Sequence, residues 1–234
     1  MKTAIIIPAY NEERTVSWVV EEARKYGDVI VINDCSTDDT EELARKAGAK
    51  VITNEKNSGL GYSLRAGFSK ALETNADIII TMDADGQHDP RDLPKFIRKV
   101  EEGYGFVLGE RNLAEYPFVK KFGNFFLNAA TNFISGTELK DTESGFRAFG
   151  RAALQKLYLT ANRYEIAVEI IFEVGRNNLK ACTVRVDSPI YVKGVSVLDG
   201  IKNFLFLMRR REKTWKGYIE DVKYVLRKSV KKRV

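Results

Sequence analysis

Short apolar runs along the first half of the chain alternate with segments in which apolar residues recur every three or four positions. The runs predict strands at 4–8, 29–32, 50–53, 77–82 and 106–109. The segments between them predict helices at 12–25, 40–47, 59–73 and 90–102. Such alternation is typical of βαβ units, so we expect an α/β fold with a mostly parallel central sheet flanked by helices.

The pattern changes after residue 112. From there the sequence predicts an aromatic-rich helix at 118–134, a polar loop at 138–149, a helix at 164–175, and strands at 180–186 and 189–192. The chain has 234 residues, enough for one large domain, and contains neither internal repeats nor a low-complexity linker. We therefore expect one domain over 1–195, with halves at 1–112 and 113–195, and a separate tail at 196–234.

The tail differs from the domain in charge and in its hydrophobic pattern. Residues 202–234 contain 12 Lys or Arg and 3 acidic residues, whereas residues 1–201 contain 26 basic and 29 acidic ones. Two amphipathic helical stripes, at 197–208 and 215–226, flank three consecutive arginines at 209–211. This combination is typical of basic helices that bind a membrane surface. The alternative is that the stripes pack on the domain and the charges face solvent.

Residues that bind zinc or form disulfides are few. The two cysteines, Cys35 and Cys182, lack a Cys-x-x-Cys spacing, and there is one histidine. Zinc sites and disulfide frameworks are therefore not expected, and a reducing cytoplasmic compartment fits best. Met1 leads directly into a predicted strand, and no apolar stretch approaches the roughly 20 residues of a membrane span. We expect a soluble or peripheral protein.

The clearest chemical motif follows the apolar run at 78–82. Asp83, Asp85 and Gln87 alternate there, so in extended backbone their side chains point the same way. A buried strand that ends in carboxylates places them at the edge where α/β sheets bind ligands. Two carboxylates and an amide oxygen predict a Mg²⁺ or Mn²⁺ site that substrate phosphates complete. The alternative is a solvated turn with Gly86 at its bend.

Three earlier loops follow predicted strands in the same way. Tyr10 and Glu12 suit stacking on a nucleobase and accepting its N–H groups. Asp34, after the second strand, suits a hydrogen bond to a base or ribose. Gly59 and Gly61, in the third loop, let backbone approach a ligand closely. The first two loops alone also fit an ordinary helix start or cap. The third matches neither a P-loop nor the Gly-x-Gly-x-x-Gly of dinucleotide sites.

Taken together, the four loops resemble the successive motifs of family 2 inverting glycosyltransferases. The matching stretches are Pro8-Ala9-Tyr10-Asn11-Glu12-Glu13, Asn33-Asp34-Cys35-Ser36-Thr37-Asp38, Asn57-Ser58-Gly59-Leu60-Gly61 and Asp83-Ala84-Asp85-Gly86-Gln87-His88. Cys35 departs from the small residue that many members carry there, which changes packing more than chemistry. The resemblance implies the Rossmann-like GT-A fold, with a nucleotide-sugar site in the half at 1–112.

The same resemblance assigns roles to residues of this half. The donor-binding residues that it implies are Pro8, Tyr10, Glu12, Asp34, Asn57, Gly59, Asp83 and Ala84. Among them, Tyr10, Glu12 and Asp34 surround the base. The implied ligands of the Mn²⁺ or Mg²⁺ ion are Asp83, Asp85 and Gln87, and Asp85 also counts as catalytic.

The half at 113–195 resembles the acceptor half of the polyprenyl-phosphate branch of this family. The resemblance is carried by Gly109-Glu110-Arg111, by the stretch at 141–147 and by the helix at 164–169. It implies that Arg111, Ser144 and Arg147 bind the acceptor phosphate, with both arginines counted as catalytic. Guanidinium groups suit this role because they bind phosphate through two hydrogen bonds and stay charged. The alternative for both arginines is a surface ion pair.

Glu169 is a candidate for orienting the sugar or the acceptor, although a glutamate on a helix is commonly solvated or paired. The reaction implied by the resemblance is an inverting, metal-dependent transfer of a hexose from a nucleotide sugar to dolichyl or polyprenyl phosphate, for glycan assembly. A phosphate monoester is largely deprotonated near neutral pH, so this acceptor needs no general base. GDP-mannose is the first donor we expect, with UDP-glucose or UDP-GlcNAc as alternatives.

An enzyme that uses a lipid acceptor is expected to act at a membrane surface. We expect a peripheral protein on the cytosolic face, attached through the basic tail at 196–234, with room for a separate membrane protein partner. Three other functions were weighed: transfer to a saccharide hydroxyl, nucleotidyl transfer, and a nucleic-acid or anionic-membrane binding module. The loop at 8–13 lacks the glycines and lysine of a nucleotidyltransferase, and no stacked-aromatic motif supports nucleic acid as a partner.

Overall fold

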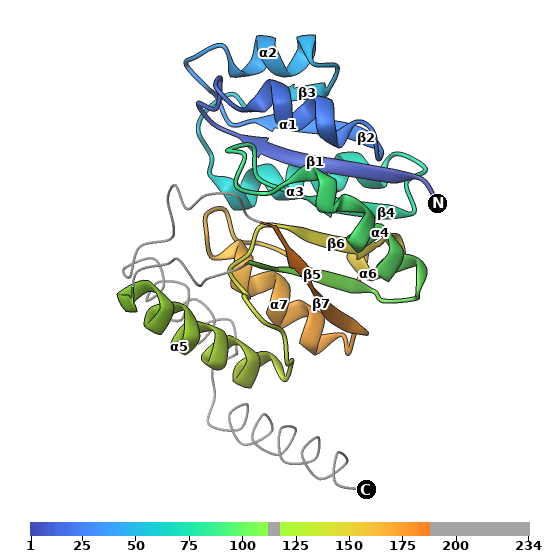
Figure 1. Ribbon diagram of the computed structural model, residues 1–234, viewed down its shortest axis with the longest axis vertical. Coiled ribbons are helices and arrows are strands. Elements are labelled where there is room, and N and C mark those ends of the chain that lie inside the picture. Colours follow the sequence, from blue (N-terminus) through green and yellow to red (C-terminus); the bar gives the residue numbers. More distant parts are fainter. Residues whose placement is uncertain (112–117, 188–234) are drawn as a thin grey trace, which may run out of the picture.

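The computed structural model describes residues 1–111 and 118–187 (Figure 1). These residues form one seven-stranded sheet in the order β3-β2-β1-β4-β6-β5-β7. The strands are β1 Thr3–Ala9, β2 Asp28–Asn33, β3 Lys50–Thr53, β4 Ile78–Thr81, β5 Phe106–Arg111, β6 Arg147–Gly150 and β7 Ala181–Val186. The helices are α1 Val16–Ala23, α2 Thr40–Lys46, α3 Leu60–Leu72, the 3₁₀ helix η1 Pro90–Asp92, α4 Leu93–Glu101, α5 Phe118–Ser135, α6 Arg151–Leu154 and α7 Ile166–Arg176.

The parallel part of the sheet is apolar on both faces. β1 pairs in parallel with β2 and β4, and β2 pairs in parallel with β3. Ile5 and Ile7 of β1 pack with α1 and α4 on one face, while Ile6 packs with α3 and α7 on the other. Strands that are covered on both faces read as continuous apolar runs, which is why the sequence predicts them well. The predicted α/β fold with a mostly parallel sheet flanked by helices is confirmed.

One interior strand runs against its neighbours. β6 pairs antiparallel with both β4 and β5, and Arg147 lies opposite Thr81 and Leu108. The polar loop predicted at 138–149 is therefore wrong at its end. β6 is short, begins with a charged residue and ends at a glycine, so its sequence carries little strand signal. Because it is antiparallel, its first residue lies at the edge of the sheet where β4 ends.

Other predicted elements are confirmed with shifted ends. The helix predicted from residue 12 begins at Val16, because turns precede it, with the Thr15 and Val16 amides donating to Glu12 O at 3.1 and 3.0 Å. The helix predicted from residue 90 opens as η1, where the Asp89 side chain accepts a hydrogen bond from Arg91 N at 2.9 Å. The strand predicted at 189–192 and the tail at 196–234 lie outside the described residues.

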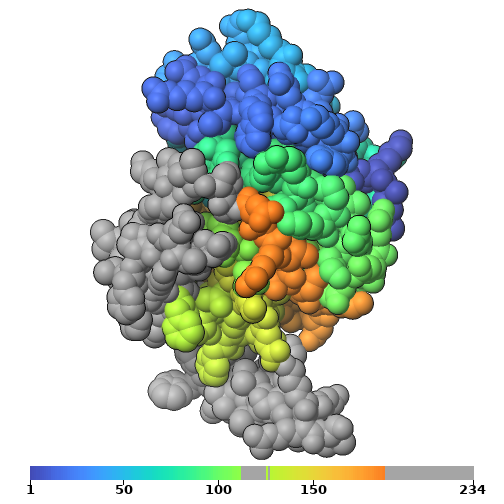
Figure 2. All heavy atoms as spheres, viewed as in Figure 1, coloured from blue at the N-terminus to red at the C-terminus, as the bar shows by residue number. Residues whose placement is uncertain are grey.

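The two halves of the domain are interleaved in the sheet, because β6 of the later half lies between β4 and β5 of the earlier half. In the space-filling view the earliest residues, in blue, form the top, and the yellow and orange residues of the later half lie below them (Figure 2). α5 packs against α7 at the lower end (Figure 1). In the described parts of the chain, none of the helices combines the length and the apolar character that crossing a membrane requires.

Candidate active site

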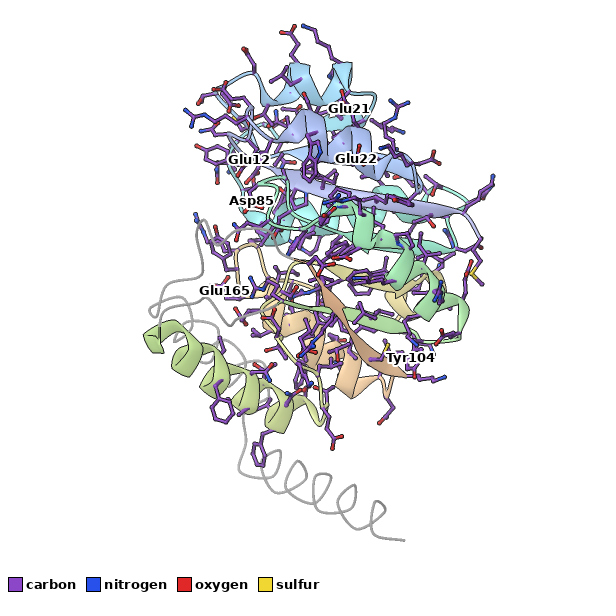
Figure 3. All side chains as sticks on the ribbon, viewed as in Figure 1. Glu12, Glu21, Glu22, Asp85, Tyr104 and Glu165 are labelled. Carbon is purple, nitrogen blue, oxygen red and sulfur yellow. The ribbon has the colours of Figure 1, made fainter. Side chains whose placement is uncertain are left out.

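The loops that follow β1, β2 and β4 meet at one edge of the sheet, because these strands are parallel neighbours. Glu12 follows β1, Asp34 follows β2, and Asp83 and Asp85 follow β4. Figure 3 shows Glu12, Asp85 and Glu165 along this same edge, so the start of α7 also reaches it. The edge therefore combines acidic residues from both halves of the chain.

Asp85 and Gln87 are joined within the loop after β4. Gln87 donates its backbone N–H to Asp85 at 2.9 Å and its side-chain amide to the second carboxylate oxygen. The side chain of Asp83 is 38% exposed and so accessible to a ligand. Asp83 and Asp85 fit the predicted metal role as they stand. Gln87 fits it only after its amide turns away from Asp85, so that its oxygen rather than its nitrogen faces the ion.

The buried side chain of His88 supports this loop from the interior of the protein. Its Nδ1 accepts a hydrogen bond from the backbone N–H of Asp83 at 3.1 Å, and its ring lies 5.1 Å from that of Phe146. The side chain is buried, and burial lowers the pKa of His88, which keeps the imidazole neutral. Sequence reasoning gave this residue no role. Its position directly after the acidic motif was the available signal.

Three carboxylates at this edge, those of Glu12, Asp83 and Asp85, lie close enough for their negative charges to interact. Burial, followed by the negative charge of Asp85, raises the pKa of Glu12 to about 6. Burial and then Asp83 raise the pKa of Asp85. Within residues 1–111 and 118–187, no group of three or more His, Cys, Asp or Glu forms a complete metal site. The two aspartates instead fit a cation whose shell is completed by water and substrate phosphates.

Mn²⁺ is expected to stabilise the protein more at about pH 7.5 than at about pH 5. Folding raises the pKa of Glu12 from 4.5 to about 6, so the stability that its proton gives is present below 4.5 and is lost as the pH rises through about 6. A cation offsets the repulsion that then appears. Thermal unfolding with and without Mn²⁺ measures the difference. Equal stabilisation at the two pH values would contradict the expectation.

The first two loops are bonded to each other. The Asn11 side chain accepts a hydrogen bond from Thr37 N at 2.9 Å, and Glu12 N donates to the Thr40 hydroxyl at 2.7 Å. Asn11 takes a positive φ of 55°, which brings the chain around after β1. Tyr10 is 47% exposed beside this turn, which suits stacking of its ring on a ligand.

Asp34 is buried and binds the third loop. Its carboxylate accepts hydrogen bonds from the Asn54 side chain at 2.7 Å, from Ser58 N at 2.9 Å and from Gly59 N at 2.8 Å. A carboxylate offers about four acceptor positions, so these three bonds leave little capacity for a base or ribose. In the structure Asp34 mainly fixes the loop, and its predicted contact with the donor stays a prediction.

The glycines of the third loop make room for another part of the chain. Gly59 has a φ of +92°, and a Cβ there would lie 2.6 Å from Asn162 O. A Cβ on Gly61 would lie 2.4 Å from Ala161 O. Only glycine tolerates such contacts. The close approach that the sequence predicts for a ligand is made here by the protein's own backbone.

The remaining donor-binding candidates differ in exposure. Asn57 is exposed in the third loop, and Pro8 is half-buried near the end of β1. Ala84 is buried and packs in the core beneath the β4 loop. Contacts of these three residues with a donor stay predictions.

Arg111, at the end of β5, forms an ion pair with Asp141. The guanidinium donates to both carboxylate oxygens at 2.7 and 2.8 Å, and Arg111 N donates to the same carboxylate at 3.1 Å. The side chains of Arg111 and Asp141 are only 17% and 2% exposed, so this is not the surface pair considered as the alternative. Asp141 begins the stretch at 141–147 that carries the resemblance, and the sequence alone predicts no role for it. Its backbone, at a φ of +55°, shapes the loop before β6.

Arg147 is buried at the start of β6. Its guanidinium donates to Ser144 O at 2.7 Å and to Thr142 O at 3.1 Å. Burial lowers the pKa of Arg147 to about 10, so the group still carries its charge at neutral pH. Ser144 is buried as well, and its backbone N–H donates to Asp141 O at 2.9 Å. The three predicted acceptor residues thus belong to one bonded unit, together with Asp141.

This unit touches the acidic loop after β4. Thr81 donates its hydroxyl to Gly145 O at 2.8 Å. A Cβ on Gly145 would lie 2.7 Å from a carboxylate oxygen of Asp83, so the two loops lie in direct contact. The structure therefore brings the predicted metal ligands beside the predicted acceptor arginines.

Glu169 is hydrogen-bonded within the protein, which is one of the alternatives considered for a glutamate on a helix. It is fully buried on α7, and its carboxylate accepts hydrogen bonds from Thr160 N, the Thr160 hydroxyl and Ala161 N. The structure does not bring this carboxylate together with the acidic loop after β4, so a direct contact with sugar or acceptor stays a prediction.

Known proteins resemble the chain in sequence and in fold. The profile of Glycosyl transferase family 2 matches residues 4–158. A UDP-N-acetylglucosamine–dolichyl-phosphate N-acetylglucosaminyltransferase of Methanococcus voltae is 34% identical over 87% of this chain and 94% of its own. A dolichol-phosphate mannosyltransferase of Pyrococcus furiosus is 28% identical over 95% of this chain and 66% of its own.

Among solved structures, glucosyl-3-phosphoglycerate synthase from Mycobacterium tuberculosis, in complex with Mg²⁺ and uridine diphosphate, has a similar fold. The TM-score is 0.72 at 21% identity, and the match covers 88% of this chain and 79% of that one. This likeness confirms the predicted GT-A fold.

Proposed function

The chain belongs to glycosyl transferase family 2 and is a glycosyltransferase, and from this premise we propose that it transfers a hexose to a polyprenyl phosphate such as dolichyl phosphate. The named acceptors of the relatives from Methanococcus voltae and Pyrococcus furiosus support the acceptor class. GDP-mannose is the first donor that we propose. The Methanococcus relative makes UDP-GlcNAc the alternative, and the synthase from Mycobacterium tuberculosis does the same for UDP-glucose.

The observation that carries this proposal is the contact between a cationic unit and an acidic loop. Arg111 and Arg147 lie in the first, and Asp83 and Asp85 in the second, with Gly145 packed against Asp83. Carboxylates that accept a cation suit the diphosphate of a nucleotide sugar. Guanidinium groups beside them suit a second, separate phosphate. Donor and acceptor phosphates would thus meet where the loops touch.

The mechanism follows from the charge of the acceptor. A phosphate monoester is mostly dianionic near neutral pH and needs no base to become a nucleophile. The guanidinium of Arg111 would bind its oxygens at the end of β5, and the buried charge of Arg147 would strengthen this attraction. The protein then has to align one oxygen with the anomeric carbon, and attack from the face opposite the leaving group inverts that carbon.

Asp83 and Asp85 would hold Mg²⁺ or Mn²⁺, with Gln87 as a third ligand once its amide turns. The bound ion supplies positive charge that stabilises the departing nucleoside diphosphate. Tyr10 stacks on the base, and the loop around Asn57 lies beside it. The solved complexes of the Mycobacterium synthase with Mn²⁺ or Mg²⁺ and uridine diphosphate support this use of a metal.

Transfer of radiolabelled sugar from GDP-mannose, UDP-glucose and UDP-GlcNAc to dolichyl phosphate tests the proposal. We expect a lipid-linked, acid-labile product from one donor, formed only with a divalent metal. No lipid-linked product from any of the three would refute the acceptor assignment. Transfer to a saccharide hydroxyl alone would favour the alternative reaction instead.

The membrane attachment is a further part of the proposal. A lipid acceptor supports work at the cytosolic face of a membrane, with the basic tail at 196–234 as the contact and a membrane protein as an additional partner. Flotation with vesicles that contain anionic lipid tests the tail, because attraction to such lipid falls as salt is raised.

A further inference from the structure

One buried carboxylate controls the shape of the loop that joins α6 to α7. Residues 155–165 form this α6–α7 loop, and Glu169 lies behind it on α7. The Glu169 carboxylate accepts hydrogen bonds from Thr160 N at 3.0 and 3.1 Å, from the Thr160 hydroxyl at 2.9 Å and from Ala161 N at 3.0 Å. An ionised acceptor that binds several donors of one loop fixes its conformation strongly.

The other side of the α6–α7 loop contacts the start of α3. Tyr62 N donates to Asn162 O at 3.1 Å. Gly59 and Gly61 pack so closely on this loop that an added Cβ would lie 2.6 Å from Asn162 O and 2.4 Å from Ala161 O. Backbone touches backbone here, so a shift of the loop moves the start of α3 with it.

The start of α3 is also the end of the third loop of the proposed donor site. Asp34 binds that loop from the side of β2, through Ser58 N and Gly59 N at 2.9 and 2.8 Å. Two buried carboxylates therefore fix the position of the third loop. Asp34 binds it directly, and Glu169 acts through the α6–α7 loop.

We propose that Glu169 is a positioning residue for the nucleotide of the donor, acting through the α6–α7 loop rather than by contact with sugar or acceptor. Its carboxylate couples α7, in the acceptor half, to the third loop, in the nucleotide half. This inference rests on the proposed function, because the third loop binds a donor only if the protein uses a nucleotide sugar. It predicts that damage at Glu169 weakens nucleotide affinity and spares the rate at saturation.

The direct test is Glu169→Gln, which keeps the shape but turns one acceptor into a donor that faces other donors. With Mn²⁺ present, the dissociation constant of GDP or UDP, measured by calorimetry, should rise about tenfold. The kcat at saturating donor should stay within about threefold of the unmodified protein. A substrate-orienting role predicts the reverse, a loss of kcat at unchanged nucleotide affinity.

Glu173→Gln is the matched control. Glu173 is buried on the same helix and accepts a hydrogen bond from Tyr158 N at 3.1 Å, in the same loop but away from the glycines of α3. It should lower the melting temperature as Glu169→Gln does, yet leave nucleotide affinity unchanged. A similar loss of affinity in both variants would mean a general structural effect and would overturn the proposal.

Two further variants test the positioning role of Glu169 if Glu169→Gln folds poorly. Gly61→Ala disturbs the same contact from the α3 side, and Thr160→Val removes the hydroxyl bond to Glu169 while keeping the backbone N–H. Both should raise the nucleotide dissociation constant, Thr160→Val by the smaller factor, and their effects should not add in the double variant. Unchanged affinity in both overturns the proposal while leaving the glycosyltransferase assignment intact. If the unmodified protein binds neither GDP nor UDP, the proposed donor class fails, and this inference fails with it.

Discussion

Asp85→Asn is expected to reduce sugar transfer by at least about a thousandfold, because it removes a charged ligand from the proposed metal site. The substitution keeps the shape of the side chain. Asparagine still accepts a hydrogen bond from Gln87 N, so the loop after β4 should keep its form. Burial and then repulsion from Asp83 raise the pKa of Asp85, so removal of its charge should leave the metal-free protein as stable as before, or more so. Initial transfer rates and melting curves, with and without Mn²⁺, measure both effects.

Asp89→Asn is the control for this substitution. Asp89 lies at the end of the same loop, where it accepts a hydrogen bond from Arg91 N at 2.9 Å and begins η1. Asparagine caps a helix about as well as aspartate, so only the pair with the exposed Arg91 is weakened. Stability should fall by less than about 1 kcal/mol, and transfer should stay close to normal. If Asp85→Asn kept its activity and its stabilisation by Mn²⁺, the metal role of Asp85 would be wrong.

Arg111→Lys is expected to lower kcat/KM for dolichyl phosphate by about a hundredfold, with little change in nucleotide affinity. Lysine keeps the positive charge that Asp141 requires, so the buried carboxylate is not left unpaired and folding should persist. It lacks the planar fork that binds a carboxylate on one side and a phosphate on the other. Rates measured as a function of acceptor concentration separate this loss from any effect on the donor.

Arg91→Lys supplies a matched comparison. Arg91 also pairs with an aspartate through several N–H groups, yet its side chain is 73% exposed and it belongs to η1. An exposed pair of this kind contributes little, so this variant should transfer sugar normally. A loss in both variants would point to a general sensitivity to lysine substitution, whereas an unaffected Arg111→Lys enzyme would exclude Arg111 as an acceptor ligand.

The sequence was most informative where burial on both faces leaves a continuous apolar run. β1, β2 and β4 are of this kind, and each ends at polar residues, so the acidic edge could be predicted from the pattern alone. β6 could not, because four residues with an arginine at one end carry no strand pattern. The acceptor role predicted for Arg111 and Arg147 came only from the resemblance, because the position of Arg147 beside the loop after β4 depends on that unpredicted strand.

The hydrogen-bond and packing partners of individual side chains were harder to predict from the sequence than the positions of those side chains in the fold. Asp34 was placed at the end of β2 correctly, but its three hydrogen bonds to the protein depend on how the third loop folds back. The glycines of that loop suggested a ligand, whereas their contact is a loop about 100 residues later in the chain. Such long-range contacts leave no periodic signal in a single sequence, because nothing local fixes which distant backbone arrives.

The segment between residues 109 and 146 leaves the sheet from β5 and returns to it at β6, and this excursion therefore begins and ends on two paired strands. Val107 lies opposite Ala148, and Gly109 N donates to Phe146 O at 2.9 Å, so the excursion leaves and rejoins the sheet at adjacent points. A segment with neighbouring end points can be exchanged between relatives without moving the strands that carry the nucleotide loops. The antiparallel strand thus makes this segment, part of the half that we propose binds the acceptor, a natural unit for chimeric enzymes. We expect such chimeras to test whether acceptor choice changes while donor choice is retained.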